Sequence, residues 1–129
     1  EKRKREARAG YRCDYIIRSA AMFLSRPVRR EELAEMPLAD ARKALCKYAG
    51  VGPKVADCIL LFSGTRQDVF PVDTWVKKVM EELYFQRPAS LREIQRFAAG
   101  HFGRLAGFAQ QYFFYYAREH METLRNMIR

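Results

Sequence analysis

The sequence lacks several features that would place it in a familiar class of protein. It has no apolar run near the roughly 20 residues that a membrane-spanning helix needs, and no apolar stretch follows its charged start as in a signal peptide. Its three cysteines, Cys13, Cys46 and Cys58, are widely spaced without a CxxC pair. A disulfide framework is therefore not expected, and these cysteines alone cannot hold a structural zinc or a four-cysteine iron–sulfur cluster. We expect a protein that is not secreted, in the cytoplasm or nucleoid of a bacterium or the nucleus of a eukaryote.

Acidic residues are also in the minority, and this bears on the binding partner. The 129 residues contain 15 Asp and Glu against 24 Lys and Arg, a net charge of +9. A hydrophobic share of 49% with 13% aromatic residues is enough to form a folded core. The composition therefore indicates one domain over residues 1–129 that binds a polyanion, with nucleic acid as the leading candidate.

Strand signals are scarce, and helical signals cover most of the chain. The one candidate strand, residues 68–72, is interrupted by Pro71. Apolar spacing predicts helices over residues 11–24, 30–35, 40–48, 54–62, 74–84 and 91–102, and a last one from about 105 through 116. The predicted N-caps are Asp40, Asp73 and Ser90, the last in a capping box with Glu93. The predicted fold class is all-α, a compact bundle of short helices.

The segment LCKYAGVGPKVADC, residues 45–58, is the most informative part of the sequence. Two helices joined by Gly50, Val51 and Gly52 form a helix-hairpin-helix over about residues 40–63. A tight reversal needs a residue that tolerates positive φ, and close approach of a DNA backbone needs a residue without a side chain. Free N–H groups at the start of the second helix would bind phosphate. The alternative is a helix–helix turn without a ligand, and the basic composition favours DNA.

Lys54 lies in the first turn of the second hairpin helix, four residues before Cys58. A lysine at such a position is ordinarily a solvated charge. Apolar neighbours and the positive end of the helix dipole would instead disfavour the ammonium and favour a nucleophilic amine. The neighbours that would supply this setting are Val55, Ala56, Ile59 and Leu60. Such an amine can attack a sugar C1′ and form a Schiff base.

Asp73 follows nineteen positions after Lys54, in the segment FPVDTW. Its ordinary role is an N-cap, and a carboxylate at a helix start is kept ionised by the dipole and the backbone N–H groups. An anion there could also stabilise oxocarbenium character at a sugar when a base departs. Pro71 would restrict the direction in which this carboxylate points. Cap and catalyst are compatible roles.

Together these motifs resemble the helix-hairpin-helix/GPD superfamily of DNA glycosylases, and within it the 8-oxoguanine DNA glycosylases. The similar segments are AGYRCDYI, GVGPKVADC, PVDTW and AGFAQQYFF, and the resemblance runs from about Ala9 to Arg118. It implies an HhH-GPD catalytic domain and a bifunctional DNA N-glycosylase/AP lyase of base-excision repair. Its partner would be double-stranded DNA with oxidised guanine opposite cytosine, bound by a monomer.

The resemblance also implies a role for individual residues. Lys54 matches the Schiff-base nucleophile and Asp73 the essential aspartate of these enzymes. The remaining matches are the base pocket of Cys58, Gln110 and Phe114, the helix-stack wedge Tyr11, the cytosine-facing Arg12, and the DNA-binding hairpin residues Gly50, Val51, Gly52 and Val55. The carbonyls of Cys46, Tyr48 and Val51 match a site for Na⁺ or K⁺. No cofactor is expected to be required, and neither zinc nor an iron–sulfur cluster is expected.

The sequence differs from this family in two respects. Members of this family are usually more than twice as long and have an N-terminal part with an antiparallel sheet, which these 129 residues do not contain. Trp75 stands where some relatives have histidine. Gln110 and Phe114 share a helix face at i, i+4, but taken alone Phe114 would be a core residue and Gln110 a solvated one.

Other functions therefore remain open. The chain could be a hairpin module that binds DNA without chemistry, inactive without its N-terminal part. It could also resemble endonuclease III, which usually carries an iron–sulfur cluster after the catalytic segment, whereas no cysteine follows Cys58. The adenine-specific glycosylases are a further alternative, but they generally lack the lysine.

Overall fold

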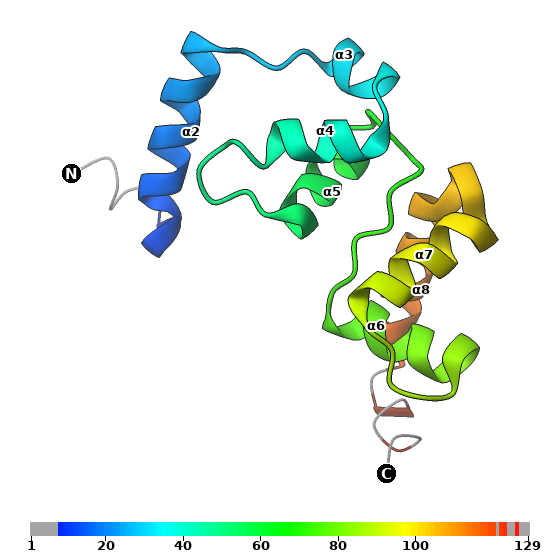
Figure 1. Cartoon of the computed structure of the whole chain (residues 1–129). Coiled ribbons are helices and arrows are strands. Elements are labelled where there is room, and N and C mark those ends of the chain that lie inside the picture. Colours follow the sequence, from blue (N-terminus) through cyan, green and yellow to red (C-terminus); the bar gives the residue numbers. More distant parts are fainter. Residues whose placement is uncertain (1–7, 121, 124–125, 127–129) are drawn as a thin grey trace. The chain divides into compact units, whose positions relative to one another are not determined.

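The computed structural model describes residues 8–120, 122–123 and 126, and in these residues it contains helices and no strand (Figure 1). This confirms the all-α fold class. The segments are η1 (Gly10–Arg12), α2 (Cys13–Ser25), α3 (Arg30–Glu35), α4 (Leu38–Leu45), α5 (Pro53–Phe62), α6 (Thr74–Met80), η2 (Glu81–Phe85), α7 (Leu91–Phe102), η3 (Gly103–Leu105) and α8 (Ala106–Glu119). The chain divides into two compact units, residues 1–56 and 57–129. The prediction of a single domain stays a prediction.

The core of the first unit is formed by residues of α3, α4, the turn after α4 and the start of α5. Its buried residues are Leu33, Ala41, Leu45, Tyr48 and Ala56. The Tyr48 hydroxyl donates a hydrogen bond to the Arg26 carbonyl at 3.2 Å, and the Phe23 ring lies 6.5 Å from the Tyr48 ring. Tyr48 therefore connects the segment after α4 to the end of α2.

The start of α4 differs from the prediction. The helix begins at Leu38 with Pro37 at the N-cap, so Asp40 lies inside the first turn and is not the cap. The backbone N–H groups of Asp40 and Ala41 both donate to the Pro37 carbonyl. A residue before the predicted cap thus already accepts the first helical hydrogen bonds, and Asp40 contributes only a favourable charge near the positive end of the helix.

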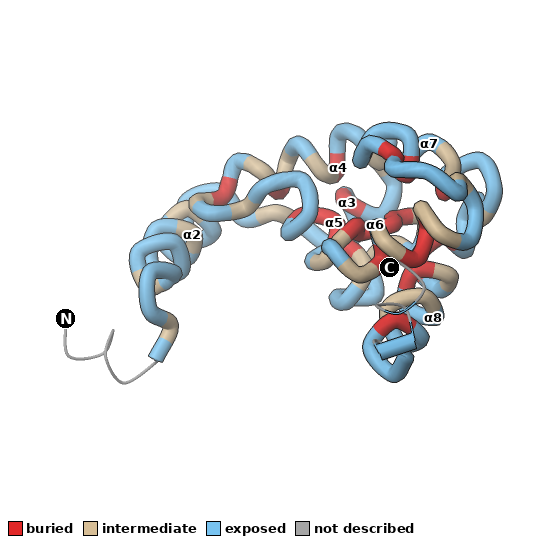
Figure 2. Tube along the Cα trace, turned by 90° about the horizontal axis from the view of Figure 1, so that it is seen from below, coloured by how far each residue is buried: buried red, intermediate tan, exposed pale blue. Residues whose placement is uncertain are grey.

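Helix α2 is more exposed than its apolar spacing suggested. None of its residues is buried, and Figure 2 shows most of the helix as exposed. Ile16, Ile17 and Leu24 expose half or more of their surface. The spacing correctly predicts a helix here, but it does not show that the apolar face is covered within the described chain.

The second unit has an aromatic-rich core between α6, α7 and α8. Its main buried cluster contains Phe70, Val72, Val76, Met80, Ala89, Ile94, Ala98 and Ala106. The segment before α6 forms no strand, as expected from the interruption of residues 68–72 by Pro71. Side chains and backbone from other elements satisfy its polar groups instead: Gln95 donates to the Phe70 carbonyl at 2.7 Å, and the Gly107 N–H donates to the Gln67 carbonyl at 2.8 Å.

Helix α6 ends earlier than predicted. It runs from Thr74 to Met80 and continues as the π-helical turn η2, not as a regular helix through Tyr84. The turn closes with a hydrogen bond from the Gln86 N–H to the Glu81 carbonyl, and Gln86 has a left-handed φ of 53°. The wider turn places the Tyr84 ring 5.0 Å from the Phe97 ring of α7.

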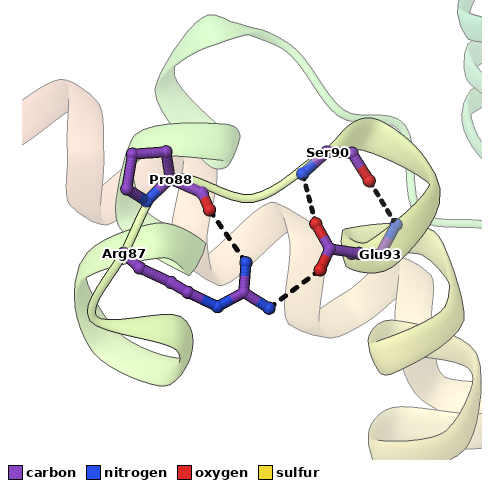
Figure 3. A network of polar contacts seen from close by, with 4 residues as sticks. All are labelled: Arg87, Pro88, Ser90 and Glu93. Atoms are coloured by element: carbon purple, nitrogen blue, oxygen red, sulfur yellow. Dashed lines mark hydrogen bonds and ion pairs between the residues drawn. The ribbon is translucent and has the colours of Figure 1, made fainter.

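The N-terminus of α7 carries the predicted capping box. The Ser90 hydroxyl accepts from the Glu93 N–H at 3.2 Å, and the Glu93 carboxylate accepts from the Ser90 N–H at 2.7 Å (Figure 3). Arg87 adds a hydrogen bond to the same carboxylate at 2.8 Å and another to the Pro88 carbonyl. The hydrogen bonds from Arg87 and from Ser90 lower the pKa of Glu93 from 4.5 to about 2.

Within the described parts of the chain, no helix has both the length and the apolar character needed to cross a bilayer.

The lowered pKa of Glu93 predicts a pH-dependent stability. Glu93→Gln keeps an acceptor for the Ser90 N–H but removes the charge that faces Arg87. Because the folded-state pKa lies below the ordinary value, the charge stabilises the fold above about pH 4.5 and this contribution disappears as the pH falls toward 2. We expect the variant to melt at a slightly lower temperature at pH 7, with a difference that shrinks on acidification.

Thermal unfolding followed by far-UV circular dichroism at several pH values measures this difference. Glu119→Gln, at an exposed position of α8, is the matched control and should show no such trend. A melting difference for Glu93→Gln that is the same at pH 3 and pH 7 would contradict the prediction.

Candidate functional site

The hairpin turn forms through local backbone hydrogen bonds after α4. The Tyr48 N–H donates to the Leu45 carbonyl at 3.1 Å, and the Val51 N–H donates to the Tyr48 carbonyl at 3.2 Å. The chain then enters α5 at Pro53, as its position at the first helical residue predicted. These bonds reverse the chain over residues 46–52, between α4 and α5, and set the start of the helix that carries Lys54.

The two hairpin glycines have different roles. Gly50 has a φ of +76°, which residues with a side chain rarely adopt, and a Cβ there would lie 2.6 Å from the ring of Tyr15. Gly52 is not in the left-handed region, and a Cβ there would have no atom within 4 Å. Gly50 is therefore required by the turn and its neighbour, whereas Gly52 leaves open space beside the loop for an approaching backbone.

Residues of η1, α2, the hairpin loop and the start of α5 line an open hollow of about 500 Å³. The Ser19 hydroxyl donates to the Ala49 carbonyl at 3.0 Å and fixes the helix to the loop. The hollow is lined by Tyr11, Arg12, Tyr15, Ile16, Ser19, Ala49, Gly50, Val51 and Val55. Five of the predicted DNA-contacting residues thus lie around one hollow, and the sixth, Gly52, is adjacent to them in the loop.

Tyr11 and Arg12 occupy the rim of this hollow on η1. Tyr11 is 73% exposed, and the Arg12 guanidinium lies 4.5 Å from the centre of its ring. A planar cation over an aromatic face is a favourable contact that leaves both groups accessible. An exposed ring beside a cation is the arrangement expected of a side chain that enters a base stack, and this role stays a prediction.

Lys54 is exposed in the first turn of α5. The apolar setting predicted for it is only half present, because Ala56 and Leu60 are buried whereas Val55 and Ile59 are exposed. Burial therefore does not desolvate this amine in the described chain. Cys58 lies one turn further along α5 and is half-buried.

Asp73 is the N-cap of α6, as predicted. Its carboxylate oxygen accepts the Val76 N–H at 2.7 Å, and the residue has extended backbone angles. The side chain is half-buried. The second carboxylate oxygen accepts no hydrogen bond from the part of the chain that the structure describes, so the capping role leaves one oxygen for another partner.

Gln110 is a buried residue of α8 that contacts the segment before Asp73. Its amide nitrogen donates to the Pro71 carbonyl at 3.0 Å, and its amide oxygen accepts from Gln111 at 2.6 Å. The alternative that Gln110 is solvated is therefore wrong. The structure brings Gln110 to the Pro-Val-Asp turn at residues 71–73, although its role in reading a base stays a prediction.

Phe114 is half-buried and packs against the main core cluster of the second unit. Phe114 is thus part of the core, and its predicted contact with the face of an extruded base stays a prediction. Trp75 is half-buried, packs with Val79 and Ala117, and has the Lys78 ammonium 5.1 Å from its ring centre. These contacts give Trp75 a structural role in α6.

The predicted cation site consists of backbone carbonyls and remains a prediction. The Tyr48 carbonyl already accepts the Val51 N–H. The described residues contain no group of three or more His, Cys, Asp or Glu side chains placed to hold a metal ion. A site at this turn would therefore use backbone oxygens of Cys46, Tyr48 and Val51.

Four residues that line the hollow were not predicted as site residues: Tyr15, Ile16, Ser19 and Ala49. Of these, Tyr15 and Ser19 contact the hairpin loop directly. The signal in the sequence was their spacing of four and eight residues from Tyr11, which places all three on one helical face.

The chain is similar over most of its length to DNA glycosylases that are considerably longer. It is 37% identical over 114 residues to a probable N-glycosylase/DNA lyase of Methanothermobacter thermautotrophicus. This match covers 88% of this chain and 36% of that protein. No model of a known protein family matches the chain.

Solved structures give the same result. The structure of MBOgg1 in complex with a low-affinity DNA ligand matches with a TM-score of 0.80 and 46% identity, over 88% of this chain and 39% of that one. The Clostridium acetobutylicum 8-oxoguanine glycosylase/lyase, bound to double-stranded DNA with cytosine opposite 8-oxoguanine, matches with a TM-score of 0.78 and 44% identity, over 89% of this chain and 40% of that one. The chain thus spans less than half the length of these relatives.

The two hairpin glycines should respond differently to alanine. Gly50→Ala should lower the free energy of unfolding by about 1–2 kcal/mol for the left-handed backbone alone, and further because the Tyr15 ring must move. Gly52→Ala should change stability by less than about 0.5 kcal/mol. Its methyl group would occupy the open space beside the loop, so it should weaken binding to a short DNA duplex.

Urea unfolding and fluorescence anisotropy measure the two effects on the same variants. Equal destabilisation by the two substitutions would contradict the assignment of the turn to Gly50. Unchanged DNA affinity of Gly52→Ala would contradict the assignment of the open approach to Gly52.

Proposed function

Because this chain is a homologue of the 8-oxoguanine DNA glycosylase/lyases that spans only part of their length, we propose that it is a bifunctional DNA glycosylase/AP lyase acting on 8-oxoguanine in duplex DNA. The observation that carries the proposal is the match to solved 8-oxoguanine glycosylase structures over 88–89% of the chain at 44–46% identity. The motifs predicted similarity from about Ala9 to Arg118, and Lys54, Asp73 and the hairpin all lie between these two residues.

The hairpin binds the duplex through its phosphates, and the net positive charge of the chain favours this binding. Gly52 lets the backbone approach, and the N–H groups at the start of α5 face the anion. Tyr11 enters the helix stack while Arg12 faces the cytosine left unpaired. The extruded base occupies a pocket formed by Cys58, Gln110 and Phe114, since a flipped base needs an apolar slot with a polar group at its edge.

The Lys54 amine then forms a bond to C1′ as the bond from C1′ to the base nitrogen breaks, and the base leaves with the electron pair of that bond. The Asp73 carboxylate stabilises the positive charge that develops on the sugar. Opening of the sugar ring gives a Schiff base between Lys54 and C1′. Loss of a proton from C2′ then expels the 3′ phosphate by β-elimination and cuts the strand.

Lys54→Gln should abolish covalent trapping. With the unaltered chain and an 8-oxoguanine–cytosine duplex, borohydride should reduce the Schiff base to a stable protein–DNA adduct visible by gel electrophoresis. The amide of glutamine cannot form this bond. Lys43→Gln, a second exposed lysine in α4, is the matched control and should trap as the unaltered chain does. An adduct with Lys54→Gln would overturn the assignment of the nucleophile.

Asp73→Asn should separate capping from catalysis. Asparagine caps a helix about as well as aspartate, so the melting temperature should be retained. Loss of the negative charge should slow base release about 10²–10³-fold in single-turnover assays. Asp73→Ala should lose about 1 kcal/mol of stability in addition. A rate for Asp73→Asn equal to that of the unaltered chain would show that the carboxylate serves only as the cap.

A second function is a DNA-binding hairpin module without chemistry. The observation that favours it is the coverage of only 36–40% of the relatives. Absence of any trapped adduct, together with salt-dependent binding that does not distinguish damaged from intact duplex, would support this function over the enzyme.

A further inference from the structure

Helix α2 contacts the hairpin loop through two residues one turn apart. The ring of Tyr15 lies against Gly50, where a Cβ would come within 2.6 Å of two of its ring atoms. The Ser19 hydroxyl donates to the carbonyl of the preceding residue, Ala49, at 3.0 Å. The loop is therefore held from outside by one apolar contact and one directional hydrogen bond.

The same helical face carries Tyr11. Tyr11, Tyr15 and Ser19 follow one another at intervals of four residues, so they lie in one row along η1 and α2. Arg12 and Ile16 form the neighbouring row, and both rows line the hollow beside the loop. A single stretch of helix thus links the exposed ring of Tyr11 to the backbone of the hairpin.

These contacts are important for the orientation of α2. No residue of α2 is buried, so a large apolar interface does not orient it within the first unit. Tyr15 and Ser19 contact the loop near the start and middle of α2, whereas the Phe23 ring, 6.5 Å from Tyr48, and the Arg26 carbonyl, which accepts from the Tyr48 hydroxyl, lie at its far end. Loss of the Tyr15 ring would remove the contact nearest to Tyr11.

We propose that Tyr15 and Ser19 are positioning residues that hold Tyr11 and Arg12 at a fixed separation from the phosphate-facing hairpin loop. The inference rests on the proposed function. An intact duplex needs only the phosphate contacts of the loop. A site with a missing or extruded base needs Tyr11 and the loop engaged on the same duplex at once, so it needs the separation that Tyr15 and Ser19 maintain.

The ratio of two dissociation constants tests this coupling. One duplex is intact, and the other contains a tetrahydrofuran abasic-site analogue opposite cytosine; anisotropy at one fixed salt concentration gives both constants. We expect Tyr15→Ala to lower the preference for the abasic duplex roughly tenfold and Ser19→Ala roughly threefold. The ratio is independent of the fraction of protein that is folded, so a general loss of stability would leave it unchanged.

Two further variants and one double variant complete the test. Tyr15→Phe keeps the ring and should retain the preference. Ile17→Ala, an exposed apolar truncation on the same helix outside the hollow, is the matched control and should also retain it. Tyr11→Ala should lose the preference, and adding Tyr15→Ala to it should cause little further loss, because both act on the same contact.

The outcomes separate this inference from the proposed function. A preference of the unaltered chain that survives in Tyr15→Ala overturns the positioning role and leaves the proposed function intact. Additive losses for Tyr11→Ala and Tyr15→Ala overturn it as well. An unaltered chain that shows no preference and forms no adduct contradicts both proposals together.

Discussion

The hairpin of this chain is arranged around the contact between Gly50 and the ring of Tyr15. Gly50 reverses the backbone in a left-handed conformation, and the absence of a Cβ leaves room for the ring. The reversal determines where α5 begins, and thereby places Lys54 in the first turn of that helix. The ring also brings the helix that carries Tyr11 beside the loop. One glycine without a side chain thus connects the backbone of the hairpin loop with the residues that line the hollow.

In the second unit, the segment before α6 is held in place without a sheet. Three donors from α7 and α8 satisfy carbonyls of this segment: Gln95 on Phe70, Gln110 on Pro71 and the Gly107 N–H on Gln67. Buried carbonyls left without such donors would be costly. The segment therefore delivers Asp73 to the start of α6 in extended backbone, and Gln110 has a structural role in addition to the one proposed for it.

Local chemistry explains which parts of the fold could be predicted. The capping box of Ser90 and Glu93, the N-cap at Asp73 and the proline at the start of α5 each depend on neighbours within four residues, and all three are confirmed. Asp40 failed as a cap because Pro37 already accepts the first helical bonds. The π-helical turn after Met80 was not predicted because it depends on packing of Tyr84 against α7.

In the candidate site, too, local features could be predicted and contacts between distant residues could not. The hairpin motif identified the loop glycines and the family resemblance identified Tyr11 and Arg12, and the structure places Tyr11, Arg12 and Gly50 around one hollow. The contact between Tyr15 and Gly50 joins residues 35 positions apart, and helical periodicity says only that Tyr15 shares a face with Tyr11. The apolar setting predicted for Lys54 was likewise only half correct, since apolar residue types nearby do not show which of them are buried.

Peptide mapping of the borohydride-trapped adduct tests the central claim most directly. Trypsin cleaves after lysine and arginine, so an unmodified chain yields separate peptides 48–54 and 55–66. Reductive attachment of the sugar to Lys54 should block that cleavage and give a single peptide over residues 48–66 that carries the added mass of the sugar remnant. Attachment at any other residue, with intact cleavage after Lys54, would contradict the account.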